Sequence, residues 1–275
     1  MHIALVHDVF HDPDGPARLS GLLERARAAG AELAVLPELP FDPWWPATRE
    51  AADEAAEGPG GSRQVRMREL ARRAGIALLG GVIFRDPTSE RRHNRALLYD
   101  ARGIEVATYD KLHLPSEEGF WESDHYEPGD EPPRRVDGCS LPLGLQICSD
   151  LNRPEGSHLL GAQGAEVLLA PRATPPGSYE RWRLVITANA ITSATFIVSV
   201  NRPRPEAGTP LGGPSLAVAP DGRVLIETTE PLSIVHLDRR ELLEARHAYP
   251  GYLAVRSALY ARGWSALAGR PPHCP

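Results

Sequence analysis

The segment LPLGLQICSDLNRPEGSHLLGAQGAEVLLAP, residues 141–171, contains two mainly apolar runs separated by a helical stretch. The runs 141–148 and 165–171 are typical of strands that are buried on both faces of a sheet, because they show little polar alternation. A helix is predicted over 154–163, since Pro154 is well tolerated in a first helical turn. Strand, helix and strand in this order indicate an α/β protein.

The same pattern continues over most of the chain. Strands are predicted over 3–6, 33–37, 76–84, 196–201 and 233–238, helices over 16–30, 62–74 and 178–193, and strand–turn–strand hairpins over 96–110 and 214–228. The two halves follow one plan, which predicts a layered domain of two sheets with internal pseudo-symmetry. No linker or change of composition divides the chain, so we expect one domain over 1–275, with a functional loop over 111–141 and a tail over 249–275 that docks on a neighbouring subunit.

Composition and charge argue against several classes of protein. The formal net charge of −6 lacks the basic surface of a nucleic-acid-binding protein. No apolar segment approaches the roughly 18 residues needed to span a bilayer, so we expect no membrane association. Three irregularly spaced cysteines and an N-terminus without a signal-peptide pattern predict a protein of the reducing cytoplasm.

One lysine stands among thirty basic residues, and it is Lys111. Lysine differs from arginine in being a compact point charge, which suits a position close to one developing negative charge or one carboxylate. The alternative is a codon preference that left a single surface lysine.

Three reactive side chains follow predicted strands, where open α/β sheets build their ligand sites. Glu38 follows the apolar run LAVLP, Lys111 follows EVATYD, and Cys148 ends a buried strand just before a helix. Backbone N–H groups and the helix dipole at such a turn are expected to stabilise a thiolate. A nucleophile, a proton carrier and a cation for an oxyanion together predict acyl-transfer chemistry. The alternatives are a structural buried cysteine for Cys148 and a helix cap for Glu38.

Several segments resemble those of the nitrilase superfamily of carbon–nitrogen hydrolases over nearly the full length of the chain. The segments are LAVLPELPF around Glu38, YDKLHLPSEEGFWESDHYEPGD around Lys111, and LGLQICSDLNRPEGSHLLGAQGAEVLLAP around Cys148. HNRALLYDARG, FIVSVNR and PSLAVAPDGRVL match further strands and turns of the family. The resemblance implies a four-layer αββα sandwich of two mixed sheets, usually dimeric, that needs no cofactor or metal.

The resemblance also implies roles for individual residues. Glu38 is the expected general base and acid, Lys111 and the backbone N–H of Ser149 hold the oxyanion, and Cys148 is the nucleophile. Glu122 matches the additional active-site glutamate of the family. Its competitors in the same loop are Glu117, Glu118 and Glu127.

Departures from the family pattern bear on the substrate. Cys148-Ser149-Asp150 is similar to the Cys-x-Asp of amidases and carbamoylases, whereas nitrile-hydrolysing members usually carry Cys-Trp-Glu. Arg153 replaces an expected aromatic residue, and it is expected either to bind a substrate carboxylate or to form a structural ion pair. Candidates for substrate contact are Trp121, Asn152, Arg153 and Arg172.

Three other functions compete with hydrolysis of a small amide or carbamoyl compound. Cys148 can pair with His113 or His125, as in cysteine peptidases, but this leaves Glu38 and Lys111 without a role. Nitrile hydrolysis by the same three residues and a non-catalytic binding protein with the same fold are the remaining alternatives.

Overall fold

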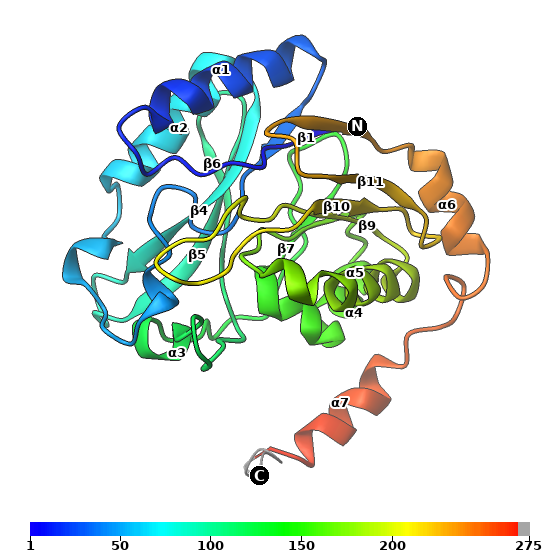
Figure 1. Cartoon of the computed structure of the whole chain (residues 1–275). Helices are drawn as coiled ribbons and strands as arrows, with labels where there is room; N and C mark the ends of the chain where they lie inside the picture. The colour runs from blue at the N-terminus through cyan, green and yellow to red at the C-terminus, as the bar shows by residue number, and fades with distance from the viewer. Residues whose placement is uncertain (269–275) are drawn as a thin grey trace.

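Two β-sheets pack face to face in the computed structural model, which describes residues 1–268 (Figure 1). The first sheet has the order β12-β1-β2-β4-β5-β6, with β3 beside β4. Its strands are β1 (His2–Leu5), β2 (Leu33–Val35), β3 (Ala56–Glu57), β4 (Ala77–Arg85), β5 (Arg92–Tyr99), β6 (Glu105–Asp110) and β12 (Ser233–His236).

The second sheet has the order β11-β10-β9-β8-β7. Its strands are β7 (Leu143–Leu145), β8 (Val167–Leu169), β9 (Phe196–Ser199), β10 (Ser215–Val218) and β11 (Val224–Thr228). In each sheet, three parallel strands lead into an antiparallel hairpin: β1, β2, β4 and then β5–β6 in the first, and β7, β8, β9 and then β10–β11 in the second. This repeat confirms the internal pseudo-symmetry that the sequence predicted.

Helices cover the outer face of each sheet. α1 (Gly15–Ala28) and α2 (Ser62–Ala74) pack on the first sheet, while α4 (Pro154–Ala162) and α5 (Tyr179–Ser193) pack on the second (Figure 1). Alternation along β1 divides the apolar residues between two layers: Leu5 faces the other sheet, whereas Ala4 faces the helices. The predicted four-layer αββα sandwich of two mixed sheets is therefore confirmed.

The central core lies between the two sheets and holds the strand ends in place. Leu33, Val35, Leu143 and Leu145 are among its fully or nearly fully buried members. Burying one such side chain contributes about 1.5–3 kcal/mol, so even three-residue strands are firmly anchored. Side chains just beyond these strands are therefore held in fixed positions.

Two local predictions differ from the structure. The strand predicted over 141–148 ends at Leu145, and Cys148 instead begins a short 3₁₀ helix, η3 (Cys148–Asn152). The loop 111–141 contains α3 (Glu122–His125).

The C-terminal part extends away from the sandwich. After α6 (Arg239–His247), helix α7 (Ser257–Ser265) projects from the rest of the chain (Figure 1). Tyr252, Tyr260 and Trp264 are exposed there. Cys274 and the end of the predicted arm lie outside the described residues. Within residues 1–268, no helix combines the length and the apolar character required to cross a bilayer.

Candidate active site

Glu38 lies in a tight turn three residues after β2. Leu39 has a φ of 47° there, in the left-handed region that leucine rarely adopts. The buried guanidinium of Arg202 donates to the carbonyl oxygens of Glu38 (2.9 Å) and Leu39 (2.8 Å). These contacts stabilise the strained turn and fix the direction of the Glu38 carboxylate, which is buried.

Lys111 follows β6 directly and is fully buried. Its Nζ donates to Glu38 Oε1 at 2.8 Å and to Glu122 Oε1 and Oε2 at 2.6 and 2.7 Å. An ammonium group has three N–H donors, so these three oxygens match its full capacity. Asn94 of β5 donates to the same Glu38 oxygen at 2.8 Å. The single lysine is thus a buried cation between two carboxylates, and the surface-lysine alternative is wrong.

Glu122 is the glutamate of the 111–141 loop that reaches Lys111. It begins α3 and is fully buried, whereas Glu117, Glu118 and Glu127 are exposed. The geometry therefore favours Glu122 over its three competitors.

Cys148 lies at the first position of η3 with a φ of 45°, again in the left-handed region. Asp150 connects this turn to β6 and to the loop that follows Lys111. Its carboxylate accepts hydrogen bonds from the backbone N–H of Ile147 (3.0 Å) and of His113 (3.0 Å) and from the hydroxyl of Tyr109 (2.8 Å). Asp150 therefore couples the position of Cys148 to the segment that carries Lys111.

Burial controls the electrostatics of the site. It raises the pKa of the Cys148 thiol well above its ordinary value, and the charge of Glu38 raises that pKa further while Lys111 opposes the rise. The expectation of a thiolate stabilised by the helix turn is therefore wrong for the resting site. Loss of hydration and the neighbouring carboxylates outweigh the donors of the turn.

The charges of Glu38, Glu122 and Lys111 affect the pKa values of Glu122 and Lys111. Burial raises the pKa of Glu122 to about 7, although Lys111 acts to lower it. Burial alone would lower the pKa of Lys111, but the charges of Glu122 and Glu38 outweigh it and raise that pKa. Lys111 is therefore a permanent cation near neutral pH, while Glu122 can hold or release a proton.

A cavity of about 270 Å³ opens onto these residues. Glu122 and Cys148 contribute to its wall, together with Ser149 and Asn152. The rest of its lining comes from Pro115, Glu117, Phe120, Ala173, Thr174, Pro175, Ser178, Arg181 and Trp182. The Sγ of Cys148 lies 3.9 Å from the carbonyl oxygen of Ala173, on the same wall. This is a small site with the reactive groups on one side and mixed apolar and charged groups on the other.

Three of the four predicted substrate contacts lie elsewhere. The ring of Trp121 stacks under Arg49, whose Cζ is 3.6 Å from the ring centroid, and Phe120 lines the cavity instead. Arg153 is exposed at the start of α4 and is not part of the cavity wall. Within residues 1–268 it also forms no ion pair, so the structural ion-pair interpretation is wrong, and the cavity wall gives no support to the carboxylate-binding interpretation.

Arg172 is buried behind the cavity. Its guanidinium donates to Ser199 Oγ at 3.0 Å, to Thr174 Oγ1 at 2.6 Å and to the carbonyl oxygen of Pro214. Three of its five N–H donors therefore bind the protein, and it supports the wall residue Thr174. Of the four candidates for substrate contact, Asn152 is the one that the structure places in the cavity wall.

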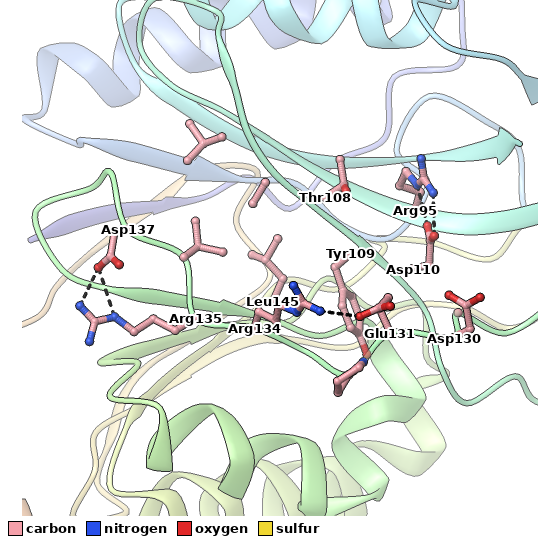
Figure 2. A pocket seen from close by; sticks show the side chains of 15 residues that line it. Arg95, Thr108, Tyr109, Asp110, Asp130, Glu131, Arg134, Arg135, Asp137 and Leu145 are labelled. Atoms are coloured by element: carbon pink, nitrogen blue, oxygen red, sulfur yellow. Dashed lines mark hydrogen bonds and ion pairs between the residues drawn. The ribbon is translucent and has the colours of Figure 1, made fainter.

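A larger cavity, with a volume of about 690 Å³, lies at the edge of the first sheet. Figure 2 shows that six of its seven charged residues pair with one another: Arg95 with Asp110, Arg134 with Glu131, and Arg135 with Asp137. No nucleophilic cysteine lines it. Size alone therefore does not identify the site, and we assign the chemistry to the smaller cavity.

The cysteine–histidine alternative is not supported by the geometry. His113 Nδ1 is 2.8 Å from Asp150 Oδ1, and His125 Nε2 is 2.7 Å from the carbonyl oxygen of Thr48. Both rings are thus engaged away from Cys148.

Asn94, Arg202, Arg181 and Trp182 were missed by reasoning from the sequence. Asn94 is a buried polar residue within the strand β5, and such a residue needs a partner. Arg202 follows the apolar run of β9, which is a similar signal. No local pattern distinguishes Arg181 or Trp182 from other residues of α5.

Comparisons with known proteins identify the family and the fold of this chain. A family model described as Carbon-nitrogen hydrolase matches residues 13–247. The "Nitrilase homolog 2" of Dictyostelium discoideum is 30% identical over 251 residues, covering 86% of this chain and 74% of the relative. The "N-carbamoylputrescine amidase" of Solanum lycopersicum is 26% identical over 260 residues, covering 87% and 86%.

Among solved structures, an amidase from Nesterenkonia sp. superposes with a TM-score of 0.77 at 28% identity, covering 96% of each chain. A cysteine-to-alanine variant of that amidase has been solved in complex with butyramide.

Proposed function

Because this chain belongs to the carbon–nitrogen hydrolase family, we propose that it hydrolyses the C–N bond of a small amide or N-carbamoyl compound through a cysteine thioester. The observation that carries the proposal is the fully buried Lys111 ammonium, held between Glu38 and Glu122 beside a cavity that Cys148 lines. Relatives named as amidases and the Cys148-Ser149-Asp150 segment favour amides over nitriles.

In the first step, Glu38 accepts the proton of Cys148 while the sulfur attacks the carbonyl carbon of the substrate. Glu38 Oε2 is buried and has no hydrogen-bond partner among the described residues, so it is free to accept this proton. The raised pKa of the Cys148 thiol means that proton transfer accompanies attack. The thiol thus stays protonated until a substrate is present.

The tetrahedral intermediate then carries a negative charge on oxygen. Once Glu38 is protonated, Lys111 turns the N–H group that Glu38 accepted towards the oxyanion, while its other two N–H groups stay on Glu122. The backbone N–H of Ser149 is the second proposed donor, because N–H groups in the first turn of a helix have no intrahelical acceptor. One such donor is worth about 2.7–4 kcal/mol of transition-state stabilisation in a water-excluded site.

Collapse of the intermediate breaks the C–N bond and leaves an acyl group on Cys148. Glu38 returns its proton to the departing ammonia or amine and then activates a water molecule. Attack of that water on the thioester releases the acid and restores the thiol. Glu122, which binds two of the three Lys111 protons, keeps the ammonium in place through both steps.

The test is an ammonia-release screen over aliphatic amides, carbamoyl amino acids and nitriles, with Cys148→Ala as the inactive control. Release from amides or carbamoyl compounds that is abolished in Cys148→Ala supports the proposal. Release from nitriles alone favours the nitrile alternative. A purified protein that turns over no compound of the three classes, or a Cys148→Ala variant that keeps activity, contradicts the proposed chemistry.

We further propose that the protein is a cytoplasmic homodimer in which the tail from Tyr249 contacts the partner. The exposed apolar side chains of this tail, including Tyr252, Tyr260 and Trp264, support the second part of this proposal.

A further inference from the structure

The start of α5 forms part of the cavity wall. Ser178, Arg181 and Trp182 all line the cavity, at positions i, i+3 and i+4. Residues with this spacing share one face of a helix, so the side chains of this face point to the same space. The start of α5 therefore presents one hydroxyl, one cation and one aromatic ring to the bound substrate.

Arg181 carries a charge that the protein leaves free. In the part of the chain that the structure describes, no carboxylate lies within ion-pair distance of its guanidinium, and this exposed side chain lines the cavity. Arg183, two residues along the same helix, pairs with Glu227 at 3.1 Å and does not line the cavity. The contrast singles out Arg181 as a cation available to a ligand.

The remaining charges of the wall define what this cation can bind. Glu122 is held by Lys111 on the inner side, so it belongs to the reactive groups. Glu117 is exposed and also lines the cavity, where its charge opposes that of Arg181. Phe120 and Trp182 supply apolar surface to the wall. A ligand that places its amide at Cys148 thus finds apolar walls and one free guanidinium.

We propose that the substrate is a small amide or carbamoyl compound that carries a carboxylate at the end remote from the C–N bond, and that Arg181 binds this carboxylate. The inference depends on the proposed function, since it places the reacting carbonyl at Cys148. A guanidinium matches the planar geometry of a carboxylate and binds it through two parallel hydrogen bonds. The cavity of about 270 Å³ restricts the compound to a short chain. Arg181 thereby takes the role that the sequence offered as one of two alternatives for Arg153.

The test compares acids with neutral compounds of the same shape. Succinamate is paired with 4-methylpentanamide, and N-carbamoyl-β-alanine with isopentylurea, so that an isopropyl group replaces each carboxylate. The two acids distinguish an amide substrate from a carbamoyl substrate. For each pair, the ratio of kcat/KM values is measured in the wild type, Arg181→Gln, Glu117→Gln and the matched control Arg183→Gln.

We expect the wild type to prefer at least one acid over its neutral counterpart by about 10-fold or more, which is typical of a hydrogen-bonded ion pair. Arg181→Gln should abolish this preference, and Arg183→Gln should retain it. Glu117→Gln should increase the preference for the acid, because it removes from the wall a negative charge that repels the substrate carboxylate. Equal or better hydrolysis of the neutral compounds, or a preference that survives in Arg181→Gln, overturns this inference and leaves the proposed function standing. Absence of hydrolysis of all four compounds and of the wider ammonia-release screen overturns both.

Discussion

Replacing Lys111 with methionine removes the buried cation and keeps most of the side-chain volume. Methionine is unbranched and similar in length, so little cavity or overpacking results. Glu38 and Glu122 then remain buried without the ammonium that contacts three of their oxygens at 2.6–2.8 Å. The variant therefore shows how much the free energy of unfolding falls when two buried carboxylates lose their counter-charge.

We expect Lys111→Met to lower the free energy of unfolding by about 3–5 kcal/mol near pH 8, the usual cost of removing one partner of a buried ion pair. The free energy of unfolding of a domain is commonly about 5–15 kcal/mol, so this loss is large but still allows a stable domain to fold. Turnover should fall below detection, because the oxyanion loses its side-chain donor.

The loss of stability in Lys111→Met should depend on pH in a defined direction. The pKa of Glu122 lies at about 7 in the folded wild type, above the ordinary value of 4.5, and Lys111 acts to lower it. Without Lys111, the folded-state pKa lies higher still. A carboxyl with a raised folded pKa contributes its stability below its unfolded pKa and loses it as the pH rises through the folded pKa. The cost of Lys111→Met should therefore be small near pH 5, grow as the pH rises above 7, and reach its full size above the higher folded pKa of the variant.

The assay is urea unfolding followed by tryptophan fluorescence at about pH 5 and about pH 8, at one protein concentration because an oligomer makes stability concentration-dependent. Glu122→Gln and the double variant Lys111→Met/Glu122→Gln complete a double-mutant cycle. The double variant should recover much of the stability lost at pH 8, since one of the two stranded charges is gone. A cost below about 1 kcal/mol at pH 8, or an equal cost at both pH values, would refute the reasoning on the buried ion pair.

Three further predictions concern the proton, the thiol and the tail. The wild type is expected to change in activity near pH 7, where Glu122 titrates. Glu122→Gln should remove that change and reduce kcat at least about 10-fold, because Lys111 loses an anionic partner and the titrating group is gone; an unchanged pH profile would assign that titration to another group. Modification of Cys148 by methyl methanethiosulfonate should be slow near pH 6 and accelerate towards alkaline pH, owing to the raised thiol pKa; rapid reaction at pH 6 would indicate a resting thiolate. Deletion of 249–275 should convert a dimer to a monomer in light scattering, whereas an unchanged mass would exclude the tail as the dimer contact.

Local patterns in the sequence were sufficient to predict the layers of the fold. Apolar runs such as 33–37 and 165–171 indicate buried strands because each residue of a strand buried on both faces must be apolar, and this holds wherever the strand lies. The sequence also predicted correctly that Glu38 and Lys111 lie beside each other, because both residues follow strands. The carboxyl ends of parallel strands and the ends of their hairpins lie at one edge of the sheet.

Other features depended on residues far apart along the chain. Asn94 and Arg202 hold Glu38 through hydrogen bonds that span 56 and 164 positions, so no window of sequence contains both partners. The choice of Arg181 over Arg153 as the free cation of the cavity likewise depends on how α5 packs against the 111–141 loop.

The sequence by itself determined the α/β layers and identified the reactive side chains, because periodicity and residue type are local properties. Only the tertiary structure decided the protonation of Cys148 and Glu122 and the shape of the cavity. Burial and neighbouring charge set a pKa, and both arise from segments that meet only when the two sheets pack together.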